Sequence, residues 1–173
     1  FVQTDPHLGN YQIRLGKKLG DDQLILFDFG ATRRYKSSFL DPYKQLLRAA
    51  FYDDELKLFT AAYALKFLEP NDSEGLKEAF RDFCSLTMEP FLKPSDPRVD
   101  AIHFGKNGDY DWKNTDLPQR LSKKVYQLIR AYGTRTPPRE VLFLDRKTGG
   151  VFVFLKVLGA NFQARELILP YLK

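Results

Sequence analysis

The stretches QTDPHLGN at residues 3–10 and LILFDFG at residues 24–30 decide how this sequence is interpreted. Two segments have a β-like composition: YQIRL at residues 11–15, directly after the first stretch, and QLILF at residues 23–27, which overlaps the second. The polar segment GKKLGDD between them contains two glycines, which favours a turn. This pattern predicts a β-hairpin. Because a hairpin returns its second strand to the start of its first, Asp28 is expected close to Asn10.

Three polar side chains in these stretches form a candidate metal and phosphate site. The carboxylate of Asp28 and the neutral amide oxygen of Asn10 are hard ligands that Mg²⁺ takes when phosphate oxygens and water fill its other positions. Asp5 lies in the same Pro-interrupted loop and is placed to accept a proton from an attacking hydroxyl group or to orient it. The alternative is that all three are turn formers that cap backbone N–H groups. The ordered pair of motifs favours the metal site.

The order Asp-x-x-x-x-Asn, hairpin, Asp-Phe-Gly resembles the catalytic loop and the DFG segment of the protein-kinase-like superfamily. The His-Arg-Asp triplet is absent, and Gln-Thr-Asp stands in its place. QTDPHLGN followed by LFDFGATRRY resembles the UbiB/AarF-type atypical kinases. The segment PPREVLFLDRKTGGVFVFLK at 137–156 and the EPF triplet at 89–91 extend this resemblance along the chain. Leu8 and Asp145 depart from residues frequent in the family, but neither departure removes a metal ligand.

The resemblance implies a mainly α fold, the helical C-terminal lobe of a kinase, with a short β-hairpin that carries the catalytic loop and the DFG segment. It implies that Asp5 is the catalytic-loop acid and that Asn10 and Asp28 bind the metal. Asn10, Asp28 and His7 would then contact the cofactor, with His7 donating to a phosphate. For His7, a local hydrogen bond within the loop is the competing interpretation. ATP and Mg²⁺ are the implied cofactors.

The activity implied by the resemblance is Mg-ATP-dependent phosphoryl transfer or ATP hydrolysis in support of ubiquinone biosynthesis. Few residues separate Gly30 from the next helical pattern, and no Ala-Pro-Glu triplet follows. Peptide-phosphorylating kinases need a long activation segment there, so a small molecule, a lipid or water is favoured as the acceptor. The expected partners are the nucleotide, this acceptor and a membrane surface in peripheral contact, and not nucleic acid. The expected location is the bacterial cytoplasm, or the mitochondrial matrix in a eukaryote.

Two other function classes remain open. A pseudokinase would use the same fold to bind nucleotide and lipid or protein partners without turnover, although the retention of Asp5, Asn10 and Asp28 argues against it. A metal-dependent phosphohydrolase unrelated to kinases would take Asp5, His7 and Asp28 as ligands and would need further His or acidic ligands. The other histidine of the sequence, His103, lies in an irregular segment.

The chain has 173 residues and 43% hydrophobic residues, which suffices for one core, so a single C-lobe-like domain over residues 1–173 is predicted. Residues 1–35 comprise the catalytic loop, hairpin and DFG segment, and residues 36–173 comprise the helical region. No strand lysine with an acidic partner and no Gly- or Ala-rich phosphate loop can be assigned. We therefore expect the nucleotide-binding lobe to be absent from this sequence and the fragment alone to be inactive.

The charge and cysteine content exclude few functions. The net charge of +5 favours anionic partners only weakly, because Lys and Arg are scattered among Asp and Glu. Cys84, the single cysteine, occurs at helical spacing from apolar residues and is predicted to be a buried, inert thiol. The longest apolar run, VFVFL at 151–155, is too short to span a bilayer.

After the DFG segment, apolar residues recur with a helical period. The expected N-caps of the first three helices are small polar residues: Ser37 or Ser38, then Asp53, then Asp72 or Ser73.

Residues 89–115 contain three prolines and no sustained period, so they are predicted to be irregular. Later helices are expected from Asp116, from Pro137-Pro138 and over roughly 163–172.

Four residues in the penultimate helical pattern stand out. Gly149 and Gly150 indicate a close approach of another segment or a kink. Arg146 and Lys147 are interpreted as a solvated or ion-paired face. In the irregular segment before this helix, Trp112 is expected either to line a pocket or to anchor its loop.

Overall fold

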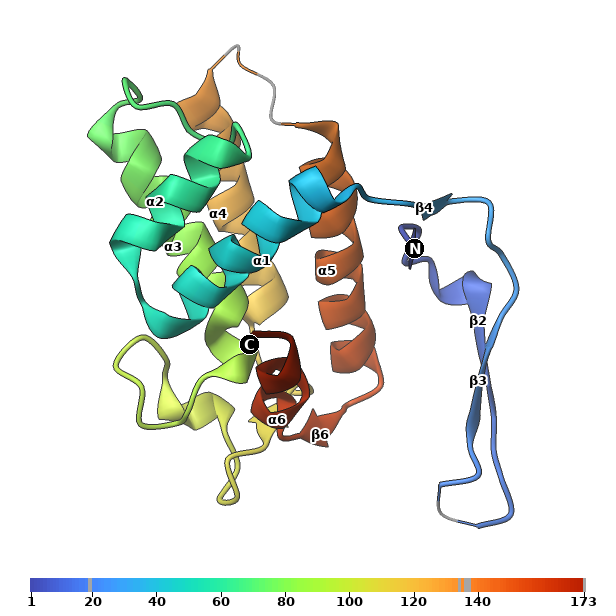
Figure 1. Cartoon of the computed structure of the whole chain (residues 1–173). Coiled ribbons are helices and arrows are strands. Elements are labelled where there is room, and N and C mark those ends of the chain that lie inside the picture. Colours follow the sequence, from blue (N-terminus) through green and yellow to red (C-terminus); the bar gives the residue numbers. More distant parts are fainter. Residues whose placement is uncertain (19, 134, 136–137, 173) are drawn as a thin grey trace.

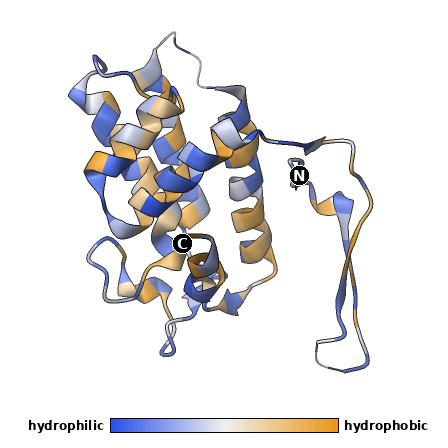
Figure 2. Cartoon of the chain, in the orientation of Figure 1, coloured by the Kyte–Doolittle hydropathy of each residue, from blue (hydrophilic) through white to orange (hydrophobic). Residues whose placement is uncertain are grey.

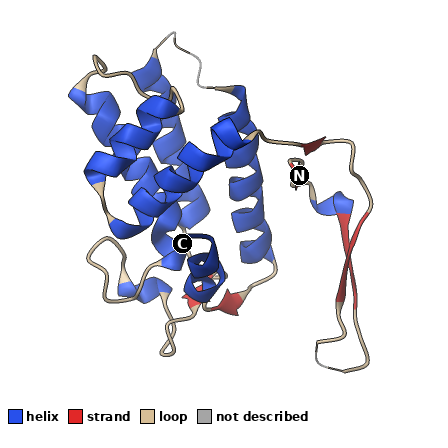
Figure 3. Cartoon of the chain, in the orientation of Figure 1, coloured by secondary structure: helices blue, strands red, loops and turns tan. Residues whose placement is uncertain are grey.

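The computed structural model describes residues 1–18, 20–133, 135 and 138–172 of the chain. Over these residues the chain is mainly helical with short antiparallel strand pairs, which confirms the predicted mainly α fold class (Figure 3). The long helices gather into one bundle, and the N-terminal hairpin extends beside helix α5 (Arg139–Val157) (Figure 1).

The predicted hairpin is present. β2 (Tyr11–Arg14) pairs with β3 (Gln23–Leu26) antiparallel along its whole length. A second antiparallel pair joins β1 (Val2–Gln3) to β4 (Thr32–Arg33) and was not predicted. This second pair brings the residues just before the Asp5 loop beside those just after the DFG segment.

The hairpin exposes apolar side chains. Leu15, Leu24, Phe27 and Phe29 are each more than half exposed, and orange segments run along this part of the chain in Figure 2. These side chains belong to neither of the two hydrophobic cores of the described residues. The hairpin is therefore held in place through its base, not through its apolar face.

α1 (Ser37–Tyr52) and α2 (Glu55–Ala64) form an antiparallel pair, but both predicted caps were wrong by one residue or more. α1 begins directly after Lys36, so Ser37 and Ser38 lie inside its first turn. Asp53 closes α1 in the left-handed conformation, with φ of 59°. The neighbouring Asp54 caps α2, and its Oδ1 accepts a hydrogen bond from the Lys57 amide at 3.1 Å.

The next two helices begin where the sequence predicts. α3 (Glu74–Met88) is capped by Ser73, whose hydroxyl accepts from the Leu76 amide. α4 (Leu117–Tyr132) begins after Asp116.

The N-cap residue of α5 is Pro138, which makes no side-chain capping hydrogen bond. Pro137, the other residue of the predicted start, lies outside the described residues.

The main core lies between α1, α2, α3 and α4, and Cys84 is buried in it as predicted. Apolar burial of this kind is the main driving force for folding. Its buried members are Leu46, Ala49, Ala50, Phe51, Leu58, Ala61, Ala62, Leu65, Phe67, Leu68, Leu76, Phe80, Cys84, Met88, Leu92, Leu128 and Leu172.

The segment 89–115 is largely irregular, as predicted, but it is firmly anchored. β5 (Tyr110–Asp111) pairs with β6 (Asn161–Phe162) near the end of the chain. Trp112 is 1% exposed and belongs to a second core, which settles its role as a loop anchor. The buried members of that core are Tyr110, Trp112, Leu117, Leu121 and Phe152.

Two 3-10 turns complete this segment, η2 (Glu89–Phe91) and η3 (Ala101–His103). The predicted last helix is divided: α6 (Ala164–Ile168) is followed by the 3-10 turn η4 (Leu169–Leu172).

A buried charge holds η2 against α4. Glu89 is 2% exposed and accepts two hydrogen bonds from the Arg120 guanidinium, at 2.6 and 2.7 Å. Its Oε1 also accepts from the Tyr110 hydroxyl at 2.5 Å, and Thr115 bonds to the same hydroxyl. A bidentate, charge-assisted arrangement of this kind fixes the geometry of both partners. It therefore ties the irregular segment to the bundle.

Candidate functional site: the Asp5 loop and the DFG segment

The predicted catalytic acid and the predicted metal-binding amide are in contact. Asn10 Nδ2 donates to Asp5 Oδ2 at 2.9 Å. Asn10 ends a short 3-10 turn, η1 (Leu8–Asn10), in which its backbone N–H donates to the carbonyl of His7 at 3.0 Å. Since its nitrogen is engaged by Asp5, the side-chain oxygen of Asn10 remains as an acceptor for a cation.

The backbone pairing of the hairpin brings Asp28 next to Asn10. The Phe27 amide donates to the Asn10 carbonyl at 3.0 Å, so Asp28 is the next residue after the point where the chain returns to Asn10. Asp28 Oδ1 accepts from the Gly30 amide at 2.7 Å, and Oδ2 has no hydrogen-bond partner in the part of the chain that the structure describes. Among the described residues, no side-chain hydrogen bond joins Asp28 to Asp5 or Asn10.

The two oxygen atoms fit a hard cation whose other ligands are water and phosphate oxygens. Asp28 contributes an exposed carboxylate oxygen, and Asn10 contributes a half-buried amide oxygen. Over the described part of the chain, no three His, Cys, Asp or Glu side chains gather into a cation site. Two oxygen ligands from the protein suit Mg²⁺, which keeps waters and phosphate oxygens in its other positions.

His7 has a local structural role. Its Nδ1 accepts a hydrogen bond from the Gly9 amide at 3.1 Å and so caps η1. The side chain is exposed, and its Nε2 is left for another partner. The structure thus brings His7 into the same loop as Asp5 and Asn10 without a contact to either side chain.

Thr4 fastens the Asp5 loop to the residue after the DFG segment. Its backbone amide and its Oγ1 both donate to the carbonyl of Ala31, at 3.1 and 2.7 Å. The side chain is 2% exposed. Thr4 could not be singled out from the sequence, because its bond to Ala31 spans the whole hairpin.

Two charged residues of α5, Arg146 and Lys147, bond to side chains in and next to the Asp5 loop. An Arg146 guanidinium nitrogen lies 2.8 Å from Asp5 Oδ1, so the candidate catalytic carboxylate bonds to Asn10 through one oxygen and to Arg146 through the other. Lys147 Nζ donates to the Tyr11 hydroxyl at 2.6 Å and to Gln3 Oε1 at 3.3 Å. Of the predicted solvated or ion-paired face, Arg146 is ion-paired, although the sequence did not identify Asp5 as its partner, whereas Lys147 bonds to two neutral side chains.

The glycine pair of α5 also serves this loop. A Cβ built at Gly150 would lie 2.2 Å from the Cβ and Cγ of Pro6, so only glycine lets the loop approach this closely. The same test at Gly149 meets nothing within 4 Å. Of the two predicted reasons for the glycines, the close approach is the one that the structure bears out at Gly150.

The comparisons with known proteins confirm the family resemblance. Residues 1–62 match the family model described as the ABC1 atypical kinase-like domain. The chain is 26% identical over 161 residues to the mitochondrial atypical kinase coq-8 of Caenorhabditis elegans, which covers 93% of this chain and 20% of that protein. It is 27% identical over 167 residues to the mitochondrial atypical kinase COQ8B of Rattus norvegicus, covering 96% of this chain and 28% of that protein.

A similar match extends to the mitochondrial atypical kinase COQ8 of Saccharomyces cerevisiae, 25% identical over 167 residues, or 96% of this chain and 30% of that protein. Along almost its whole length the chain is thus similar to the COQ8 atypical kinases, and its first 62 residues match the ABC1 atypical kinase-like domain. It spans between a fifth and a third of the length of these curated relatives. Within the described residues, no helix combines the length and apolar character needed to cross a bilayer.

Proposed function

We propose that this chain carries the catalytic loop and the metal-binding segment of a UbiB-type atypical kinase or ATPase that uses Mg-ATP. The observation that carries the proposal is the hydrogen bond of 2.9 Å between Asn10 and Asp5, with Asp28 returned beside Asn10 by the hairpin. In the proposed reaction, these three side chains would supply one proton acceptor and two oxygen ligands for the metal.

Each side chain has a defined part in the proposed reaction. Asn10 and Asp28 would hold Mg²⁺, which neutralises charge on the phosphates. Asp5 would accept the proton of the attacking hydroxyl group, while Asn10 and Arg146 hold its carboxylate in position. His7, through its remaining nitrogen, would donate to a phosphate oxygen. The γ-phosphoryl group passes to the acceptor oxygen, and ADP leaves.

The short connection after the DFG segment supports a small acceptor. Only residues 31–36 separate Gly30 from the start of α1. A peptide substrate needs an extended segment there to dock on, so a small molecule, a lipid or water is the proposed acceptor. Peripheral contact with a membrane would give access to a lipid acceptor.

The proposed biological role is support of ubiquinone biosynthesis, by the family resemblance. The relatives from C. elegans, rat and yeast carry the word mitochondrial in their names, so a mitochondrial location is proposed for a eukaryotic source of this chain. The bacterial cytoplasm is the corresponding proposal for a bacterial source.

Mg²⁺-dependent ATP turnover by the full-length protein tests the proposal. Asp28→Asn should reduce turnover by about a hundredfold or more, because it removes the anionic metal ligand. Asp5→Asn should reduce turnover to a similar extent while ATP still binds. Asp41→Asn, an exposed site on α1, is the matched control and should leave turnover unchanged. Undiminished turnover in Asp28→Asn would contradict the metal assignment.

A pseudokinase is the second candidate, and one observation favours it. Both oxygens of the Asp5 carboxylate already have partners, Asn10 and Arg146, so the proton acceptor is engaged before any substrate binds. A full-length protein that binds Mg-ATP but turns it over no faster than the Asp5→Asn variant would establish this alternative.

A further inference from the structure

A groove runs along α5 on the side facing the bundle, away from the Asp5 loop. It consists of a cavity of about 110 Å³ between α1, α3, α4 and α5 and an adjoining one of about 330 Å³ between α3, α4 and α5. Phe83, Thr87, Val125 and Asp145 line both cavities, so the two adjoin at these residues. We call the two adjoining cavities together the α5 groove.

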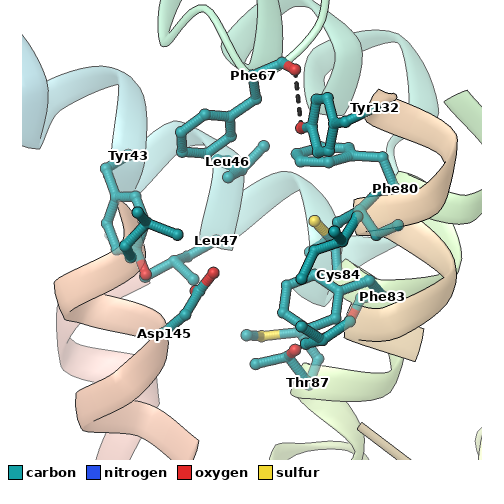
Figure 4. A pocket seen from close by; sticks show the side chains of 16 residues that line it. Tyr43, Leu46, Leu47, Phe67, Phe80, Phe83, Cys84, Thr87, Tyr132 and Asp145 are labelled. Atoms are coloured by element: carbon teal, nitrogen blue, oxygen red, sulfur yellow. Dashed lines mark hydrogen bonds between the residues drawn. The ribbon is translucent and has the colours of Figure 1, made fainter. Parts of the chain in front are cut away.

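The α5 groove is apolar apart from one carboxylate. Its lining consists almost wholly of aliphatic and aromatic side chains, with a few hydroxyl groups and the Cys84 thiol. Asp145 is the one charged residue among the residues that line it. Figure 4 shows the Asp145 side chain directed from α5 into the space between α1 and α3.

Asp145 has no internal partner in the described part of the chain: it takes part in none of the hydrogen bonds or ion pairs found there. Three hydroxyl groups of the lining donate to backbone carbonyls: Thr87 to Phe83, Ser122 to Pro118 and Tyr132 to Phe67. An ionised carboxylate in apolar surroundings is costly unless a cation or donor faces it. The groove therefore has a carboxyl group with no partner among the described side chains.

The titratable groups around Asp145 do not supply a cation. Tyr43 from α1, Cys84 from α3 and Tyr132 from α4 face the same cavity, and burial raises the pKa of each, so all are neutral at pH 7. Burial also raises the pKa of Asp145 to about 7. The carboxylate would regain its charge when a cation lies against it.

We propose that the α5 groove is a binding site for a small apolar molecule that carries one protonated amine, with Asp145 as the counter-ion of the ammonium group. The size agrees, because an apolar cavity of roughly 150 Å³ can hold a benzene ring, and the groove combines a smaller and a larger cavity. Charge complementarity selects the amine: in so apolar a lining, a carboxylate–ammonium contact is the polar interaction that gives specificity. Nucleotide is not required, so this site is independent of the proposed function.

The probe pair is 2-phenylethylamine and 2-phenylethanol, which share one carbon skeleton and differ in charge. The amine is protonated at pH 7.5, as a lysine side chain is. We expect the full-length protein to bind the amine at least tenfold more tightly than the alcohol in ligand-observed NMR titrations. Asp145→Asn keeps the shape of the side chain and should remove this preference. Asp41→Asn, exposed on α1 and outside the groove, should keep it.

A second variant tests the location. Val125→Phe places a larger side chain where the two cavities join, so it should weaken binding of both probes at least tenfold. The proposal is overturned if neither probe binds the unmodified protein, or if Asp145→Asn retains the preference for the amine. Equal affinity of the unmodified protein for the two probes would overturn it as well.

Discussion

Gly150 of α5 lies directly against Pro6 of the Asp5 loop, at a distance that excludes any side chain: an added Cβ would be 2.2 Å from two atoms of the proline ring. The neighbouring Gly149 has open space around its Cα. Two adjacent glycines in one helix therefore have different roles, and one of them sets how closely the candidate catalytic loop can approach the bundle.

Gly150→Ala should destabilise the protein by about 1–3 kcal/mol, because the loop or the helix must move to admit the methyl group. Gly149→Ala is the matched control and should stabilise it by about 0.5–1 kcal/mol, since alanine is the better helix former and nothing obstructs it. Chemical denaturation of both variants measures the difference. Equal effects of the two substitutions would show that Pro6 does not contact α5 in solution.

The parts of this site that follow from short-range pattern could be predicted. The hairpin follows from the alternation of residues 11–15 and 23–27 around a glycine-containing turn, and this pairing alone returns Asp28 to Asn10. The helices after Ser73 and Asp116 begin where predicted, and at Ser73 the side chain makes the capping hydrogen bond. Local hydrogen-bonding chemistry is visible in a single sequence.

Contacts between distant segments could not be predicted. The partner of Arg146 lies 141 positions away, and helical periodicity does not encode which segment a helix face will meet. The same limit applies to the pairing of β5 with β6. The cap errors have a different origin, since Asp53 and Asp54 are both good caps and only the left-handed backbone at Asp53 decides between them.

The Glu89–Arg120 pair should be worth more than a surface ion pair. Arg120→Met leaves the Glu89 carboxylate buried with only the Tyr110 hydroxyl beside it, so we expect a loss of about 3–5 kcal/mol. Lys57→Met removes the exposed pair with Asp54, in which the lysine is 77% exposed, and should cost far less than Arg120→Met. Denaturant unfolding of the two variants tests this, and a loss below 1 kcal/mol for Arg120→Met would contradict it.

Asp145 should make stability depend on pH. Its folded-state pKa is raised to about 7 by burial, above the value of about 3.9 in an unfolded chain. Between pH 4 and pH 7 the folded state therefore holds a proton that the unfolded state has lost, so stability falls as the pH rises through this range. The loss is complete once the pH exceeds the folded-state pKa.

Asp145→Asn cannot ionise and should be more stable than the unmodified protein at pH 8, with the advantage disappearing by pH 4. Thermal unfolding over this pH range measures the difference. Asp41→Asn, at an exposed position, should show no such trend. An advantage of Asp145→Asn that is constant from pH 4 to pH 8 would show that the Asp145 carboxyl is not perturbed.

Arg146 should act on turnover more than on stability. The guanidinium is 62% exposed, so loss of its ion pair with Asp5 should cost less than about 1 kcal/mol of stability. On the proposed function, Arg146→Gln frees one Asp5 oxygen, loosens the position of the proton acceptor and should lower kcat by about tenfold without changing the affinity for Mg-ATP. Arg146→Lys keeps a charge at this position and should recover part of the loss. An increase in kcat on Arg146→Gln would mean that the ion pair restrains Asp5 instead of orienting it, and that Arg146 must withdraw before the carboxylate can accept a proton.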